Sequence, residues 1–387
     1  MLTIYMPDDS SNVLLFNKSH SLVFDCEPEK IKYTNDITKS NLVVMLCRYT
    51  NAEIAEQYDY LRENGYTNQP VCALTVFHID QNVFHIDETQ RHLGSAPTAY
   101  FDPHAVLVSV YGKDKVLVVH HNHAQQEHPD LVYYDMMYAR SKLYYIEYEN
   151  HDMNKRVWTY YSSKKMYELS EIKKTPNPKH YLAPMRTYDN NSHFSDVSRI
   201  KYRKQLRDFL PKDKGYVSDL LQGVVLIPQE HEDNIVNYFA SPENNYAGGT
   251  WYPVHNDYYN DSLVSIYVES ITYGTEVTSL TEKTFDPLIK GHFVLPFGYK
   301  GLVQDILSYG FILPNWLDYS YDDYDDDCRW EKYLESVSKY INTPIEELVR
   351  HVHDDMCILQ HNRAVFYDRP KDSLIDIIEE RMKLLST

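Results

Sequence analysis

The sequence predicts an α/β protein with two domains, each built from a parallel β-sheet with helices on its faces. Apolar segments of strand length alternate with amphipathic segments of helix length along the chain. That alternation is typical of parallel sheets flanked by helices. The chain has 387 residues, which suits two domains of roughly 100–200 residues each. A polar, proline-bearing stretch at residues 172–184 divides the alternation into two halves, so we expect the linker there.

In the first half, continuous apolar runs predict strands at 41–49 and 71–80, and the spacing of apolar residues predicts a helix at 52–66 between them. Two further apolar runs, at 104–112 and 115–121, are expected as strands that could pair as a hairpin across Gly112. Residues 131–149 have helical spacing, with a strand as the alternative because tyrosines are frequent there.

The second half repeats the pattern after a first strand near 180–184. Strands are predicted at 263–270 and 292–298, and helices at 198–210, 281–291 and 301–311. Amphipathic segments at 326–341, 345–368 and 373–386 end the chain as helices. The predicted domains are residues 1–175 and 176–345, followed by C-terminal helices at 346–387.

Composition narrows the function classes. The net charge of −18 repels a phosphate backbone, which disfavours broad nucleic-acid binding but leaves room for a local basic groove. Five widely spaced cysteines without a C-x-x-C motif indicate reduced thiols rather than a disulfide framework or zinc ribbon. The chain shows no signal peptide and no membrane-length apolar run, so we expect a cytoplasmic protein. Phosphate-binding P-loop, dinucleotide and serine-hydrolase glycine motifs are absent.

The most informative segment runs from 263 to 298. Its first strand would deliver Glu269 and Ser270 at the carboxyl edge of a sheet, where open α/β sheets bind ligands. Thr281 is a candidate N-cap, followed by Glu282 and Lys283 in the first helical turn. A helix start with a lysine suits an anion, and an acid beside it suits ribose hydroxyls, so the pattern favours a nucleoside diphosphate. Ordinary helix-dipole chemistry is the competing interpretation.

The same segment resembles the donor-binding region of fucosyltransferases, in which F-E-N-S is followed by Y-x-T-E-K and an apolar strand. The matching pieces are Glu269-Ser270, Thr281-Glu282-Lys283 and the strand at 293–298. Ser270 stands where the family has Asn, and Leu280 replaces the aromatic residue before T-E-K. Over roughly residues 180–340 the chain also resembles glycosyltransferase-like proteins of tailed phages.

A second cationic segment lies at 183–210. A strand would end near Arg186, and the helix after it carries Arg199, Lys201, Arg203 and Lys204. The segment resembles the fucosyltransferase helix whose arginine meets the donor diphosphate. Arginine suits that role because its guanidinium donates two parallel hydrogen bonds. The competing interpretation is a solvated helix face.

The resemblance implies the GT-B arrangement, with two Rossmann-like domains facing a cleft and C-terminal helices packing back toward the N-terminal domain. It implies transfer of a sugar from a UDP- or GDP-type donor to an acceptor hydroxyl, without a metal or other cofactor. The N-terminal domain would hold the acceptor and the C-terminal domain the nucleotide sugar. Donor binding would fall to the residues matched above: Arg186, Arg199, Arg203, Glu269, Thr281, Glu282 and Lys283.

The catalytic base is expected in the first half. His121 ends the strand at 115–121 and His123 follows it, and Asp80 ends the strand at 71–80. A neutral histidine or a carboxylate could take the acceptor proton. The histidines at 120–128 also leave open a metal-dependent hydrolase, although no standard zinc spacing is met.

The acceptor is open. The phage resemblance suggests a hydroxylated base in phage DNA, in which case the protein would act in the host cytoplasm; a glycan is another candidate. A non-catalytic pair of such domains, serving as a binding protein or in virion–host interaction, is the alternative function. The sequence predicts no membrane partner and leaves the oligomeric state open.

Overall fold

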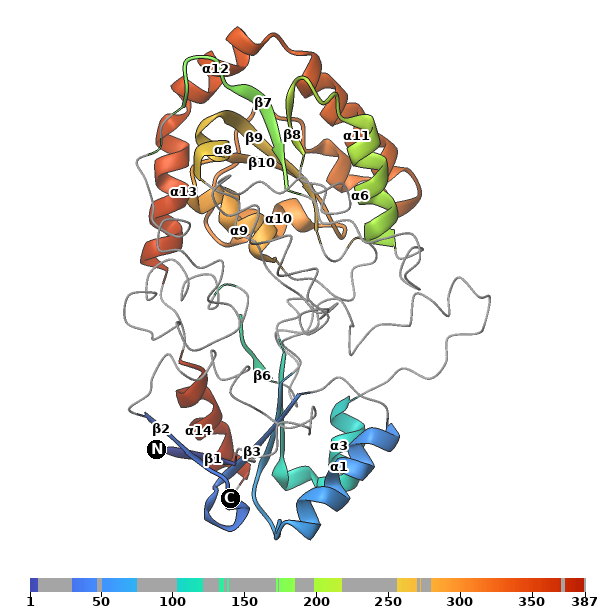
Figure 1. Cartoon of the computed structure of the whole chain (residues 1–387), viewed down its shortest axis with the longest axis vertical. Helices are drawn as coiled ribbons and strands as arrows, with labels where there is room; N and C mark the ends of the chain where they lie inside the picture. The colour runs from blue at the N-terminus through green and yellow to red at the C-terminus, as the bar shows by residue number, and fades with distance from the viewer. Residues whose placement is uncertain are drawn as a thin grey trace, which may run out of the picture. The chain divides into compact units, whose positions relative to one another are not determined.

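The computed structural model describes residues 1–5, 30–46, 51–74, 103–120, 132–135, 138, 172, 174–184, 198–217, 256–269, 272, 280–369 and 373–385. Contacts divide the chain into two compact units (Figure 1). Unit 1 comprises Met1–Leu143, Glu276–Ser279 and Lys371–Thr387, and unit 2 comprises Tyr144–Thr275 and Leu280–Pro370. The two units are described separately below.

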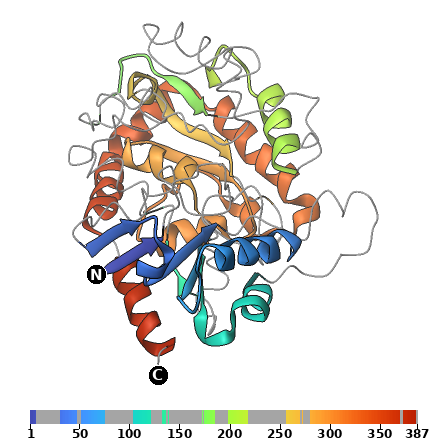
Figure 2. The same ribbon diagram turned by 60° about the horizontal axis from the view of Figure 1, so that its bottom comes forward.

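Unit 1 is built on a six-stranded sheet in the order β2-β1-β3-β4-β5-β6, in which every neighbouring pair is parallel. The first three of these strands run side by side in dark blue in Figure 2. The strands are β1 (Leu2–Tyr5), β2 (Ile31–Thr34), β3 (Leu42–Leu46), β4 (Val71–Leu74), β5 (Val116–His120) and β6 (Val132–Tyr133).

Helices cover both faces of this sheet. Because side chains alternate along a strand, Val43 packs with α1 (Asn51–Glu63) and α3 (Pro103–Tyr111) on one face. Val44 points to the other face, toward the C-terminal helix α14 (Leu374–Leu385). Burial on both faces explains why the strands read as continuous apolar runs in the sequence.

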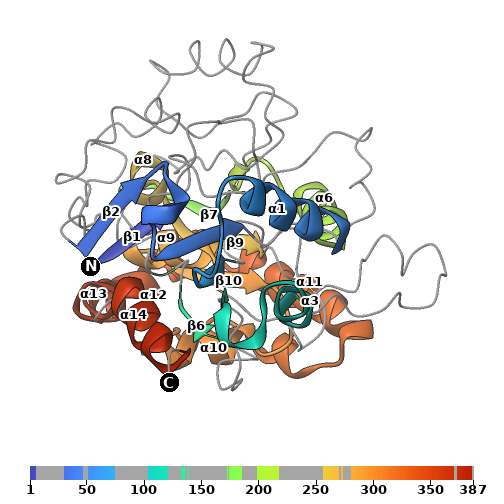
Figure 3. The ribbon, with the colours of Figure 1, turned by 90° about the horizontal axis from the view of Figure 1, so that it is seen from below.

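The last helix completes the core of the unit that begins the chain. Ile375 and Ile378 of α14 are buried among strand residues such as Leu117. The α-amino group of Met1 also lies 2.8 Å from Oε1 of Glu379, so the start of the chain and α14 are neighbours (Figure 3). Exposed ion pairs contribute little to stability, so apolar burial is the main force that holds α14.

Unit 2 contains a four-stranded parallel sheet in the order β10-β9-β7-β8. Its strands are β7 (Lys179–Ala183), β8 (Gly215–Val217), β9 (Ser262–Val268) and β10 (Phe293–Phe297). All residues of β9 and β10 are buried, so these two strands form the centre of the described core.

The two faces of this sheet carry different helices. Val264, Ile266 and Val268 of β9 pack in one cluster with α6 (Ser198–Phe209), α11 (Asp326–Asn342) and α12 (Ile345–Asp354). The alternate residue Tyr267 turns to the opposite face, where its hydroxyl bonds Thr284 in α9 (Glu282–Ile289). Three further helices complete the described part of unit 2: α8 (Asn256–Asn260), α10 (Leu302–Ser308) and α13 (Met356–Asp368).

The predicted α/β class with two Rossmann-like parallel sheets and C-terminal helices is confirmed. The predicted cleft and the domain limits at 175 and 345 stay predictions. The strand predicted at 104–112 is wrong, because this segment is the helix α3. The predicted hairpin with β5 is therefore wrong as well. The helix predicted at 345–368 is two helices, α12 and α13, with Asp355 between them. Of the segment 131–149, Val132–Tyr133 is a strand, the alternative that the tyrosines suggested.

Removing buried apolar volume from α14 should destabilise unit 1. Ile378 is fully buried against the sheet, so Ile378→Ala should lower the free energy of unfolding by about 2–5 kcal/mol. Leu384 on the same helix is 60% exposed, and Leu384→Ala should change it by less than about 0.5 kcal/mol. Chemical denaturation followed by circular dichroism measures both, and equal effects would contradict this packing of α14.

Candidate functional site

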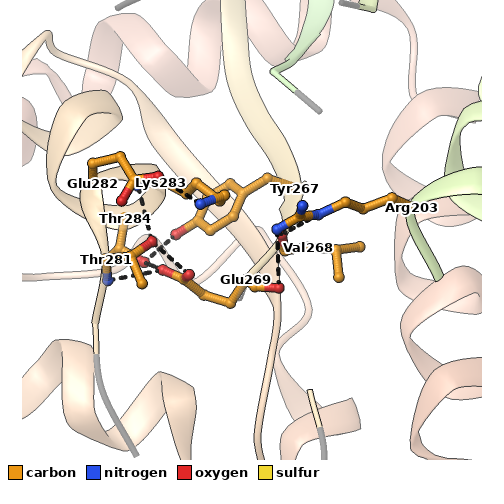
Figure 4. Close-up of polar contacts among 8 residues, drawn as sticks. All are labelled: Arg203, Tyr267, Val268, Glu269, Thr281, Glu282, Lys283 and Thr284. Atoms are coloured by element: carbon orange, nitrogen blue, oxygen red, sulfur yellow. Dashed lines mark hydrogen bonds and ion pairs between the residues drawn. The ribbon is translucent and has the colours of Figure 1, made fainter. Parts of the chain in front are cut away.

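The candidate site lies where β9 ends, at the carboxyl edge of the sheet in unit 2. Glu269 directly follows β9 and lies next to the start of α9 (Figure 4). Parallel sheets bind ligands at this edge because the helices that follow the strands begin there. The residues that shape it come from β9, α9 and α6.

Glu269 is completely buried, and its carboxylate is bound to the first turn of α9. Oε1 accepts hydrogen bonds from the main-chain N of Thr281 (3.1 Å) and from Oγ1 of Thr284 (2.8 Å), and Oε2 accepts one from Oγ1 of Thr281 (2.6 Å). A buried carboxylate is costly unless such donors surround it. The helix dipole also favours a negative charge here.

A tyrosine extends this group of hydrogen bonds into the core. The hydroxyl of Tyr267 donates to Oγ1 of Thr284 at 2.8 Å, and Thr284 in turn donates to Glu269. Burial, together with the nearby charge of Glu269, raises the pKa of Tyr267 far above its ordinary value. The phenol therefore keeps its proton and stays a donor.

The start of α9 confirms the local structure predicted from T-E-K. Thr281 is the N-cap, and its hydroxyl oxygen accepts from the main-chain N of Lys283 at 3.3 Å. The next two side chains reach the surface in part, since Glu282 is 20% and Lys283 16% exposed. Nζ of Lys283 lies 2.5 Å from Oε1 of Glu282. The main-chain N–H groups of Thr281 and Lys283 are already bonded within this group.

Arg203 holds the end of β9 from the other face of the sheet. It is 4% exposed, and its Nε and Nη2 each donate to the main-chain O of Val268 at 3.2 Å. Nη2 also lies 3.4 Å from the main-chain O of Glu269. Arg199 stands four residues earlier, in the first turn of α6. Arg203 therefore ties α6 to the same end of β9 that carries α9 (Figure 4).

The structure thus brings together the predicted residues Arg203, Glu269, Thr281, Glu282 and Lys283. Their contacts with a donor stay predictions, as does the predicted contact of Glu269 with the sugar or ribose. Other predicted site residues lie outside the described residues: Asp80, His121, His123, Arg186 and Ser270. The backbone of Arg199 is described as part of α6.

A second buried arginine binds the main chain beyond Glu269, at Thr272. Arg329 of α11 is 1% exposed, and its Nη2 donates to the main-chain O of Thr272 (3.2 Å) and to Oδ1 of Asp326 (2.8 Å). Asp322 lies 3.5 Å from Nη1 of the same guanidinium and accepts from the main-chain N of Val303 in α10 at 2.9 Å. Asp322 and Asp326 therefore bind Arg329 and the start of α10, while Asp325 pairs with Lys300. No metal-holding group is found among the described residues.

A group of basic side chains that the sequence did not predict lies at the opposite end of β9. Nζ of Lys174 donates to the main-chain O of Tyr259 (2.8 Å) and of Ser262 (2.9 Å). Nε2 of His292 lies 2.7 Å from the same O of Tyr259, and Nζ of Lys290 lies 5.0 Å from the centre of the Tyr259 ring. These residues are far apart in sequence, and a lysine in a polar linker carries no signal of burial.

Burial moves the protonation equilibria of this group. It lowers the pKa of Lys174 to about 7, helped by the charge of Arg363, and it lowers the pKa of Lys290 against the opposing effect of Asp286. Burial and then the charge of Lys174 push the pKa of His292 far below its ordinary value. A neutral His292 fits its bonds, since Nε2–H donates to the carbonyl and Nδ1 can accept from the hydroxyl of Ser265 at 2.9 Å.

Comparison with known proteins leaves the family open. No family model and no curated protein matches the sequence. A solved structure of the wall teichoic acid polymerase TagF aligns with 99% of this chain and 89% of its own, at 11% sequence identity and a TM-score of 0.28. A similarity of this size carries no weight for function.

Among the helices within the described ranges, none has the length and apolar character needed to cross a bilayer.

Alkaline pH should stabilise unit 2. An unfolded lysine keeps its proton up to about pH 10.4, whereas folded Lys174 releases it near pH 7. The unfolded state therefore binds more protons between pH 7 and 10, so the free energy of unfolding rises with pH in that window. Lys174→Met should reduce the rise and leave the part that Lys290 contributes through its own lowered pKa, while Lys339→Met, at a 73% exposed side chain, should leave the whole rise unchanged. Urea denaturation at several pH values measures this, and parallel profiles for all three proteins would contradict it.

Proposed function

We propose that unit 2 binds a nucleoside diphosphate at the carboxyl end of β9, and that the protein is a glycosyltransferase using a nucleoside-diphosphate sugar. The observation that supports this most is the position of Glu269. Its carboxylate binds the first turn of α9 and its main-chain O contacts Arg203 of α6. Glu269 therefore links α9, which carries Lys283 in its first turn, to α6, which carries Arg199 in its first turn.

In this proposal the cations neutralise the diphosphate. The Lys283 ammonium would bind one phosphate, and Arg199 and Arg186 would complete the charge compensation. Leaving-group departure builds negative charge on the diphosphate, so fixed cations there stabilise the transition state. Glu282, 20% exposed beside Lys283, would accept hydrogen bonds from the ribose hydroxyls. Phosphate binding would exchange the Lys283–Glu282 ion pair for two contacts with the ligand.

The acceptor side of the reaction is assigned to unit 1. A base there, His121, His123 or Asp80, would take the proton of the acceptor hydroxyl as the oxygen attacks the anomeric carbon. The GT-B arrangement would place this base across a cleft from the donor. The finer proposal for the acceptor is a hydroxylated base in phage DNA, with a glycan as the other candidate. The net charge of −18 weighs against DNA unless a basic track lines the cleft.

Lys283→Ala should weaken binding of UDP or GDP by roughly 10- to 100-fold, because a hydrogen bond to a charged group contributes about 1.5–3 kcal/mol. Isothermal titration calorimetry measures the affinity. Lys332→Ala is the matched control, since this lysine pairs with Glu335 on the surface of α11 and should bind as the parent does. Unchanged affinity in Lys283→Ala would remove this site from the proposal.

Turnover separates an enzyme from a non-catalytic binding protein. We expect slow release of UDP or GDP from one member of a panel of nucleotide sugars, and faster release once the correct acceptor is added. DNA with hydroxymethylated bases and a glycan mixture are the two acceptors to compare, at low and moderate salt because phosphate-backbone contacts weaken with salt. Binding of nucleotide sugars without any release would favour the non-catalytic alternative.

A further inference from the structure

Glu269 acts on two helices through two different groups. Its side-chain carboxylate binds α9, and its main-chain O lies 3.4 Å from Nη2 of Arg203 in α6. The residue therefore joins the beginning of α9 to α6 across the end of β9 (Figure 4). At 0% exposure the carboxylate has no surface with which to touch a ligand.

We propose that Glu269 is a positioning residue that fixes the Lys283 turn of α9 relative to α6, and that this fixed spacing makes the site select nucleoside diphosphates over monophosphates. The inference rests on the proposed function, because it concerns how the same site recognises its ligand.

The hydrogen bonds of Glu269 fix the turn at both of its ends. Thr281 donates to the carboxylate from its main-chain N at 3.1 Å and from its hydroxyl at 2.6 Å. Thr284 donates to it from its hydroxyl at 2.8 Å. Lys283 lies between these two threonines and its main-chain N bonds Oγ1 of Thr281. Rotation of this turn about the helix axis, or a shift along it, would break these hydrogen bonds.

Several hydrogen bonds also hold α6 to the end of β9. Two nitrogens of Arg203 share the main-chain O of Val268 at 3.2 Å, and one of them also contacts the O of Glu269. Arginine favours such an arrangement because its planar guanidinium presents several donors in fixed directions. A movement of α6 would break bonds to two consecutive carbonyls of the strand end.

Rigid spacing between two helix starts favours a ligand with two phosphates. In the proposed site the two cations are Lys283 on α9 and Arg199 on α6. A monophosphate can bind one of them, and its affinity does not depend on the position of the other. A diphosphate gains from both only when their separation matches its own, and preorganisation then lowers the entropy cost of binding. Removing the hydrogen bonds between Glu269 and α9 should therefore weaken diphosphate binding more than monophosphate binding.

The test compares UDP with UMP, and GDP with GMP, by calorimetry on the full chain. Glu269→Asp shortens the side chain by one methylene group and cannot reach Thr281 and Thr284 together. Glu269→Gln keeps the length and one acceptor oxygen. We expect the parent protein to prefer the diphosphate by about tenfold or more, the Asp variant to lose most of this preference, and the Gln variant to retain most of it.

Two further variants keep the test decisive. Thr284→Val removes one donor to Glu269 at nearly constant volume and should reduce the preference if the Asp variant does not fold. Tyr319→Phe removes a buried hydrogen bond to the main-chain O of Val294, on β10, and is the control for lost stability. It should keep the full preference even where its melting temperature falls as far as that of the Glu269 variants.

The outcomes separate this inference from the proposed function. A parent protein that binds neither diphosphate defeats both. A parent that prefers diphosphates, with Glu269→Asp and Thr284→Val retaining that preference, overturns the positioning role and leaves the proposed function standing. The same holds if the preference falls equally in Tyr319→Phe, because a general loss of stability would then explain it.

Discussion

The arrangement at the carboxyl edge of unit 2 depends on a buried negative charge that its surroundings must compensate. The Glu269 carboxylate is fully removed from water, and an ionised group in such a place is tolerated only with several hydrogen-bond donors around it. Two threonines and the positive end of α9 supply that compensation. The requirement works in both directions: the carboxylate needs this turn of helix, and the turn is held in place by its hydrogen bonds to the carboxylate. The position of the neighbouring Lys283 is a consequence.

The neighbouring strand end shows the same physical solution with different residues. After β10, the carboxylate of Asp322 accepts from the main-chain N of Val303 in the first turn of α10, and Arg329 lies beside it. Burial raises the pKa of Asp322, while Val303 and Arg329 oppose that change. The two carboxylates differ in their surroundings, since α9 presents the partly exposed Glu282 and Lys283 after its cap. That difference is why we place the ligand at α9.

The sequence predicted elements well where a pattern was local and poorly where contacts joined distant residues. The buried strand β9 and the capped helix α9 follow from a continuous apolar run and from Thr281. The segment 104–112 misled because a short, continuously apolar run fits a buried helix as well as a buried strand, and α3 is buried against the sheet through Leu107. The part played by Glu269 could not be predicted, because its partners lie 12 and 15 residues further along the chain. Nor does any local pattern indicate that Lys174 bonds carbonyls 85 and 88 residues away.

The cations described at the carboxyl end of β9 are of two kinds, according to what they bind. Arg203 and Arg329 are almost completely buried, and each donates to a main-chain carbonyl at or just after the end of β9. Guanidinium groups suit this because they stay charged and offer many directed donors. Lys283 is instead part-exposed and bonded to an acid next to it, an ion pair that a phosphate could replace at little cost. An acidic chain can therefore use arginine to build the frame of a phosphate site and keep a lysine for the ligand, which explains how a protein of net charge −18 could bind a diphosphate without a broad basic surface.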